Sequence, residues 1–318
     1  MNRKTIWTAL LLLTLVLVGA ALFADVGKLK AAALHYPFGM LVPACALVLG
    51  NYTLRSLRFR RYLQALGIYV TPVEAWLVFV SGFLLTVTPG KMGEIFKGFL
   101  LNERRGTPIP EVASSVVAER FTDVLGLLAI AAIGVAHYGA HTGLFLGVLG
   151  LCLGFLLGVA HPRLLPWLLD GLTARTHAHP RLAKLVALGR RVHGVLRILC
   201  GPRLLLEGVG LAALAWLLEA IAFRLLLNGV DATGGLGPAI VVYAMATLFG
   251  AVSMLPGGVG STEAVMVALL LAPALGLGLA KPEATLVTLL IRFCTLWFGV
   301  GMGAIALFVL RRTPVRNR

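Results

Sequence analysis

Charged residues that could do chemistry lie inside long apolar stretches of this sequence. Glu119, Arg120 and Asp123 occupy one apolar run, and the two acids share a helical face because they are four residues apart. Charge in other apolar runs comes from Glu219, Arg224 and Arg292. Because charge is costly in an apolar medium, such residues normally face a cavity and pair with one another. Two interpretations remain open: a structural ion-pair network, or a site whose arginines hold an anionic group through paired N–H donors.

A short motif occurs twice, each time in the middle of a broken apolar stretch. Its first copy is Pro89-Gly90-Lys91-Met92-Gly93, and its second is Pro256-Gly257-Gly258-Val259-Gly260. An Arg beside a Phe precedes and follows each copy at similar distances, which predicts an internal repeat. Glu94 follows the first copy and Glu263 the second. Pro and Gly end helices and allow tight turns, so the motif suits a plain structural turn as well as a binding site.

The composition predicts that lipid surrounds nearly all of this chain. Of its 318 residues, 59% are apolar and only 13% are charged, whereas soluble domains carry roughly 25% charged residues. The net charge of +15 comes from short basic clusters at the ends of apolar runs, a pattern typical of membrane topology rather than nucleic-acid binding. We therefore expect no nucleic-acid partner.

Apolar runs of about 20 residues, long enough to cross a bilayer, predict six full spans. The runs are Thr5 to Ala24, Phe38 to Leu57, Val112 to His137, Thr142 to Ala160, Leu204 to Leu227 and Ala284 to Leu310. Two further stretches, Val73 to Leu101 and Pro238 to Leu271, contain the repeated motif, and each piece is short for a crossing of its own. We expect both to turn back as re-entrant helical hairpins.

The placement of Lys and Arg predicts the orientation of the chain. If both hairpins turn back, most basic residues, Arg55 and Arg58 among them, fall in cytoplasmic segments, and both termini are cytoplasmic. The hairpins then enter from opposite sides, which makes the halves an inverted repeat, as in many secondary transporters. Two complete crossings per broken stretch would leave the loop sides unchanged. The expected fold is one all-α polytopic membrane domain over 1–318, with repeats at about 38–137 and 204–310.

The basic segment 161–203 separates the two predicted repeats. Apolar residues are interleaved there with basic ones at helical spacing. The apolar residues are Leu182, Leu185, Val186, Val192, Val195 and Leu196. This pattern predicts an amphipathic helix on the inner leaflet. A positively charged tether with no further role fits the same pattern.

Catalytic and cofactor-binding motifs are absent from the sequence. It has no Walker loop, no nucleophile elbow, no His-Glu-x-x-His and no nucleotide-binding fingerprint. The four cysteines are far apart, and no His pair has an acid or Cys beside it to complete a metal site. We expect no cofactor, no metal and no enzymatic activity. A membrane-embedded enzyme with Glu94 or Glu263 as general base is the alternative.

Three segments resemble the lysylphosphatidylglycerol synthase transmembrane-region family, also called flippase-like. They are Thr86-Val-Thr-Pro-Gly-Lys-Met-Gly-Glu94, Ala118-Glu-Arg-Phe-Thr-Asp123 and Leu255-Pro-Gly-Gly-Val-Gly-Ser-Thr-Glu263. The resemblance covers nearly the whole chain. In that family, the membrane domain of the multiple peptide resistance factor is associated with flipping aminoacylated phosphatidylglycerol. A soluble aminoacyltransferase domain that follows in some members is not expected here, and stand-alone members include proteins associated with hopanoid biosynthesis.

The resemblance implies a set of site residues and a function. Positions that match the family's motifs are Pro89, Gly90, Gly93, Glu94, Glu119, Arg120, Asp123, Pro256, Gly257, Gly258, Gly260 and Glu263. The residues themselves add Lys91, Arg224 and Arg292. The expected function is movement of a polar or anionic lipid, of aminoacyl-phospholipid, polyprenyl-linked or hopanoid type, between the leaflets of a bacterial inner membrane. The alternative is a non-transporting accessory subunit that partners an envelope-lipid or hopanoid biosynthesis enzyme.

Overall fold

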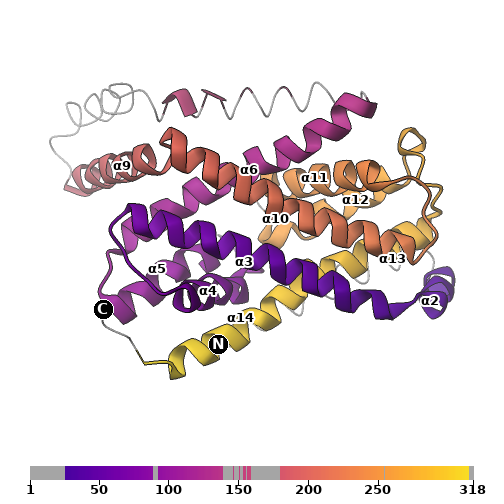
Figure 1. Ribbon diagram of the computed structural model, residues 1–318, viewed down its shortest axis with the longest axis horizontal. Helices are drawn as coiled ribbons and strands as arrows, with labels where there is room; N and C mark the ends of the chain where they lie inside the picture. The colour runs from indigo at the N-terminus through magenta and orange to yellow at the C-terminus, as the bar shows by residue number, and fades with distance from the viewer. Residues whose placement is uncertain are drawn as a thin grey trace.

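The computed structural model describes residues 26–88, 92–138, 180–253 and 255–314, with a few isolated residues between 146 and 158 (Figure 1). Every element within these ranges is a helix, which confirms the all-α prediction for this part of the chain. The spans predicted at Thr5 to Ala24 and Thr142 to Ala160 lie outside these ranges.

Three helices in the described ranges are long and apolar enough to cross a membrane. The first comprises η1 (Phe38–Met40) and α3 (Leu41–Ala65), and the second is α10 (Pro202–Asn228). The third joins α13 (Lys281–Arg292) to α14 (Phe298–Arg312) through a π-helical turn at Phe293–Trp297. A fourth predicted span lies within the 30-residue helix α6 (Ile109–Tyr138), which carries several charges. The count of six full spans therefore stays a prediction.

The two broken stretches form helical hairpins. The first consists of α4 (Pro72–Ser81), η2 (Gly82–Leu85) and α5 (Met92–Arg105). The second consists of α11 (Leu236–Val252), η4 (Pro256–Gly258) and α12 (Ser261–Leu270). Each of these helices is shorter than the roughly 20 residues that a crossing needs. In Figure 1 the α4–α5 pair lies toward one end of the long helices and the α11–α12 pair toward the other.

Local chemistry explains where the hairpin helices begin and break. The hydroxyl of Thr71 accepts a hydrogen bond from the backbone N–H of Glu74. Pro72 occupies the first turn of α4, where a backbone N–H would have no partner within the helix, so its absence costs nothing. In the second hairpin Gly257 and Gly260 adopt φ values of 60° and 88°. Residues other than Gly rarely adopt this left-handed backbone conformation. The two glycines therefore allow the chain to reverse direction between α11 and α12.

Helix α10 occupies the centre of the bundle, where it packs against α3, α6, α11 and α13. Small side chains allow the close approach, since Ala212, Ala215, Ala220 and Ala222 are fully buried on it. At the crossing with α6, a Cβ added to Gly126 would lie 2.7 Å from the Cβ of Ala212. Close backbone contact at these small residues is thus combined with the burial of large side chains such as Phe223 and Leu226 on the same helix.

Two further helices complete the described part. Helix α2 (Val26–His35) packs against α13, and α9 (Pro180–Leu199) packs against α6. The predicted amphipathic pattern is present in α9, whose Val186, Val195 and Leu196 are buried while Arg190 and Arg197 are exposed. The apolar face of α9 therefore lies on protein.

At two positions the structure differs from the assignment based on loop charge. The sequence assigns Arg55 and Arg58 to a cytoplasmic segment beside the end of the span, but both belong to α3, which continues as one helix to Ala65. Both arginines are buried inside the bundle. Asp123 on α6 pairs with both guanidinium groups, so their charge is partly compensated within the protein.

Candidate functional site

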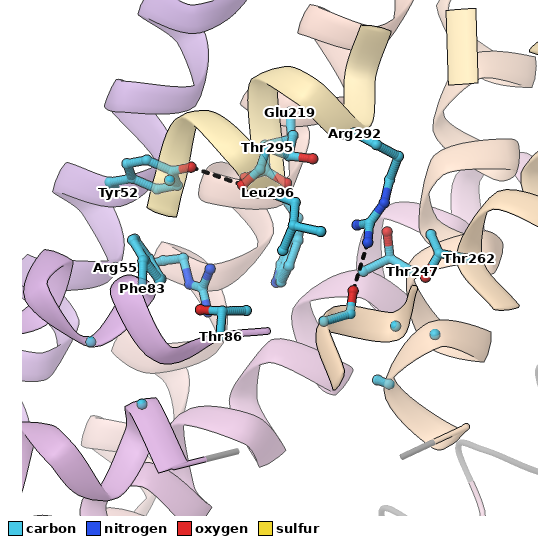
Figure 2. Close-up of a pocket in the computed structure, with 18 of the residues that line it drawn as sticks. Tyr52, Arg55, Phe83, Thr86, Glu219, Thr247, Thr262, Arg292, Thr295 and Leu296 are labelled. Atoms are coloured by element: carbon cyan, nitrogen blue, oxygen red, sulfur yellow. Dashed lines mark hydrogen bonds between the residues drawn. The ribbon is translucent and has the colours of Figure 1, made fainter. Parts of the chain in front are cut away.

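A cavity of about 230 Å³ lies between the two hairpins (Figure 2). The first hairpin contributes Gly82, Phe83, Thr86, Gly93 and Lys97 to its wall. The second contributes Gly250, Ala251, Leu255, Gly257, Gly258 and Thr262. The long helices α3, α6, α10 and α13 supply charged and aromatic side chains around these two tips. Residues from both copies of the repeated motif, or from the segments beside them, thus line the cavity.

Positive charge dominates the wall of this cavity. Its basic residues are Arg55, Lys97, Arg120 and Arg292, and its only acid among the described lining residues is Glu219. In Figure 2 Arg55 and Arg292 approach the cavity from different sides. Cations held in an apolar surrounding attract anions more strongly than they would in water. The wall is therefore suited to a group with negative charge.

Asp123 on α6 holds three arginines. Its Oδ1 accepts a hydrogen bond of 2.7 Å from Nη2 of Arg58, and its Oδ2 accepts one of 3.1 Å from Nη2 of Arg55. Nη1 of Arg120 lies 3.4 Å from Oδ2. One carboxylate cannot neutralise three guanidinium groups, so this cluster retains positive charge, and two of its members, Arg55 and Arg120, line the cavity. Asp123 lies behind the wall and positions both of them.

Lys97 and Arg55 are each held by aromatic rings as well as by an acid. Nζ of Lys97 donates to Oε2 of Glu119 at 2.8 Å and lies 4.8 Å from the ring centres of Phe59 and Phe79. The guanidinium of Arg55 lies 5.1 Å from the ring centre of Trp216. Cation–π contacts of this kind stabilise a desolvated cation and fix its position. Both side chains are thereby preorganised at the cavity wall.

Arg292 on α13 holds the tip of the second hairpin. Its Nε donates to Oε1 of Glu263 at 2.6 Å, and its Nη2 donates to the carbonyl oxygen of Gly257 at 2.6 Å. The other carboxylate oxygen of Glu263 accepts the backbone N–H of Gly260 at 2.7 Å. This last bond satisfies a free donor at the start of α12. Glu263 and Arg292 therefore link the motif backbone to the cavity wall.

The tip of the first hairpin is closed by contact between two glycines. A Cβ placed on Gly93 would lie 2.2 Å from the carbonyl oxygen of Gly82, a separation that no real side chain could adopt. Gly at position 93 therefore allows α5 to touch η2 directly. Pro89, Gly90 and Lys91 of the same motif lie outside the described residues, and Glu94 belongs to α5 without a described side chain.

Glu219 on α10 differs from the other buried acids in its partner. Its Oε2 accepts a short hydrogen bond from the hydroxyl of Tyr243 on α11. The hydroxyl of Tyr52 on α3 donates to the carbonyl oxygen of Thr295 at 2.9 Å, close to the same part of the wall (Figure 2). Hydroxyl groups of Thr86, Thr247 and Thr262 also line the cavity and can donate to or accept from a bound polar group.

The structure brings most of the predicted site residues to one place. Gly93, Arg120, Gly257, Gly258 and Arg292 line the cavity. Acids that hold its cations from behind are Glu119, Asp123 and Glu263. Pro256 begins the helical turn at the second tip, where Gly260 precedes α12. Arg224 is elsewhere, because it donates to the carbonyl oxygen of Ala232 at 3.3 Å and is not among the lining residues.

Arg55, Tyr52 and Tyr243 are polar residues of the wall that were not among the predicted site residues. A signal for Arg55 does exist, because Arg55 and Arg58 are three residues apart and so share a helical face. Such a pair complements the acids on α6. The two tyrosines have no sequence signal, since only packing shows that their hydroxyls are buried. Within the described residues no group of three or more His, Cys, Asp or Glu side chains could hold a metal ion.

Comparison with known proteins identifies two similarities. The family model described as "Lysylphosphatidylglycerol synthase TM region" matches residues 6–303, most of the chain. The chain is also 26% identical over 146 residues to a protein named glycosyltransferase AglD from Haloferax volcanii. That match covers 43% of this chain and only 23% of the relative. The similarity to AglD therefore concerns a minor part of that protein.

Proposed function

Since the chain belongs to the lysylphosphatidylglycerol synthase transmembrane-region family, we propose that it moves a lipid with a polar or anionic headgroup between the leaflets of the inner membrane. It is a multi-pass membrane protein with several long apolar helices. The observation that carries the proposal is a cavity between two helix breaks of a membrane domain, in which four of the five charged lining residues are cations. Within the hydrocarbon region of a bilayer, non-helical backbone is tolerated only where it is buried in protein or lines a water-filled cavity.

The charge and size of the cavity favour an anionic headgroup. Four cations line it, and three of them are arginines, whose planar N–H groups match the oxygens of a phosphate. Its volume of about 230 Å³ is below the roughly 300–1,000 Å³ of typical pockets for whole small ligands. A headgroup fits this space better than an entire lipid does. The acyl or polyprenyl chains would therefore stay in the surrounding bilayer while the headgroup passes through the protein.

The arrangement of the hairpins supports transport rather than catalysis. The α4–α5 and α11–α12 hairpins lie toward opposite ends of the long helices, and both tips reach the cavity (Figure 1). In an inverted repeat, such tips can open alternately toward the two sides of the membrane. We propose this repeat, with both termini cytoplasmic, as the basis of alternating access. No covalent chemistry is required, because the lipid leaves as it entered.

A leaflet-exchange assay tests the proposal. The full chain would be reconstituted into phosphatidylcholine vesicles that contain fluorescent phosphatidylglycerol, lysyl-phosphatidylglycerol, polyprenyl phosphate or phosphatidylcholine. We expect faster exchange of at least one anionic or polar lipid than of phosphatidylcholine. R120Q, which changes the cavity wall, should lose this acceleration, whereas R224Q, an arginine on a long helix away from the cavity, should keep it. Equal exchange with and without protein for every probe would overturn the proposal.

One observation favours a second candidate, an accessory subunit of an envelope-lipid enzyme. The similarity to part of a protein named glycosyltransferase shows that related membrane segments occur in longer proteins. Under this hypothesis α9, with its exposed arginines, would contact the enzyme. Deletion of residues 180–199 would then abolish function and co-purification of an enzyme, while R120Q would leave both intact. The opposite result favours transport.

A further inference from the structure

Glu219 is the one acid that is buried without a cation, among the side chains that the structure describes. The other buried acids, Glu74, Glu119 and Asp123, each have a Lys or Arg nitrogen within salt-bridge distance. Glu219 is 3% exposed and lines the cavity, and its one hydrogen-bond partner within the described part of the chain is the hydroxyl of Tyr243. An ionised carboxylate in such a place loses its hydration without a salt bridge in exchange, which favours its neutral, protonated form.

Charged and titratable groups face Glu219 from every helix that packs against α10. Helix α3 contributes Tyr52 and Arg55, α11 contributes Tyr243, and α13 contributes Arg292. Helix α6 contributes Arg120 at the wall and Asp123 behind it. Of these, Arg55 and Arg292 are positively charged and Asp123 is negatively charged. Glu219 therefore faces charges of both signs, which act on its protonation in opposite directions.

An anion bound in the cavity would change this balance. It would pair with the wall cations that partly compensate Glu219, and it would repel a negatively charged carboxylate. The hydrogen bond to Tyr243 does not prevent protonation, because a hydroxyl group can donate to a carboxylate or accept from a carboxylic acid. Bound anion and ionised Glu219 are therefore mutually unfavourable within one cavity.

From this geometry we propose that Glu219 is the proton-binding residue of the site and that one proton enters on Glu219 for each anionic headgroup bound. The inference rests on the proposed function and deepens it, because it specifies the coupling of the same cavity. The proton comes from the aqueous side that the cavity faces and returns to water when the headgroup leaves. Net movement of an anionic lipid would consequently follow a proton gradient across the membrane.

The test is the pH dependence of binding to the purified full chain in a neutral detergent. The probe is dihexanoyl-phosphatidylglycerol, a short-chain lipid whose phosphodiester stays singly ionised over about pH 5–9, the range in which buried Glu residues titrate. If binding requires one added proton, the Kd should rise about tenfold per pH unit above the pKa of Glu219. E219Q, which carries a permanently neutral group, should bind tightly and lose this dependence.

Two further variants make the result specific. E207Q is the matched control, because Glu207 lies on the same helix but is paired with Arg203 at 3.4 Å outside the cavity. It should keep the wild-type dependence on pH, including any contribution from histidines. Y243F removes a hydrogen bond that favours the ionised carboxylate, so the pH at which binding weakens should move upward. Y243F also provides a test if E219Q fails to fold.

The outcomes separate this inference from the proposed function. Binding by the wild type with no pH dependence, a full pH dependence in E219Q, or an unchanged midpoint in Y243F would overturn proton coupling and leave lipid binding intact. No binding by the wild type at any pH would count against an anionic phospholipid as cargo, and so against both. An infrared difference spectrum between low and high pH gives a readout without ligand. The carbonyl stretch of a protonated carboxyl group should be present in wild type and E207Q, and its persistence in E219Q would contradict the inference.

Discussion

Replacement of Asp123 by Asn should destabilise the protein strongly, because it leaves buried arginines without their counterion. The side chains of Arg58 and Arg55 are 0% and 7% exposed, and each donates a hydrogen bond to this carboxylate. Removal of one partner of a buried pair typically costs about 3–5 kcal/mol. The contact with Arg120 adds less, since it is longer, at 3.4 Å, and that side chain is 41% exposed. We expect D123N to lower the free energy of unfolding by about 3 kcal/mol or more.

Equilibrium unfolding in mixed micelles, followed by circular dichroism, would measure this effect. The decisive comparison is the double variant D123N/R58M, which also replaces the most deeply buried arginine by an apolar side chain of similar length. Because an apolar replacement of a buried ion pair is often neutral or stabilising, the double variant should be more stable than D123N alone. E207Q, at a surface pair whose Arg203 side chain is 92% exposed, should change stability by less than about 1 kcal/mol. A loss below about 1 kcal/mol in D123N, or no recovery in the double variant, would refute the reasoning.

Other predictions concern both hairpin tips and the outer end of the bundle. In a thermal unfolding assay, G93A should lower stability by roughly 1–3 kcal/mol through overpacking, because its Cβ would lie 2.2 Å from a backbone oxygen of the opposite limb. G210A, where nothing lies within 4 Å of the added Cβ, should be nearly neutral in this assay. E263Q should accelerate amide hydrogen exchange at 257–261, because it weakens the hydrogen bond from Arg292 that holds this tip; unchanged exchange there would contradict that role. Burial raises the pKa of Tyr36 to about 12 from its usual 10.0. The folded state therefore favours the protonated phenol, so its contribution to stability is present below pH 10 and is lost as the pH rises toward 12. Y36F should show a smaller fall over that interval in a pH series of unfolding curves.

The sequence alone predicted helices, membrane insertion, and the positions where two apolar stretches break. These features depend on local chemistry: apolar residues avoid water over a whole run, and Pro and Gly end helices wherever they occur. The motif residues Gly93, Gly257 and Gly258 were therefore recognised, and they do line the cavity. The family resemblance rests on the same local segments, and the match over residues 6–303 confirms it.

Partners in space were harder to predict, and Arg55 illustrates why. Positive charge near the end of an apolar run is normally cytoplasmic, so a rule based on loop charge places this residue outside the membrane. Its partner Asp123 is 68 residues away along the chain and becomes adjacent only when α3 packs beside α6. Charge counting along the chain contains no information about that packing.

The sequence by itself thus determined that this is a helical membrane protein, where its helices break, and to which family it belongs. Only the tertiary structure decided that both breaks reach one cavity, that Asp123, Glu119 and Glu263 hold its cations from behind, and that Glu219 faces it with Tyr243 as partner. The physical reason is the distance along the chain over which the interactions act. Helix formation and lipid preference depend on neighbouring residues, whereas the charge of a cavity depends on which distant helices pack together and which acids their cations meet there.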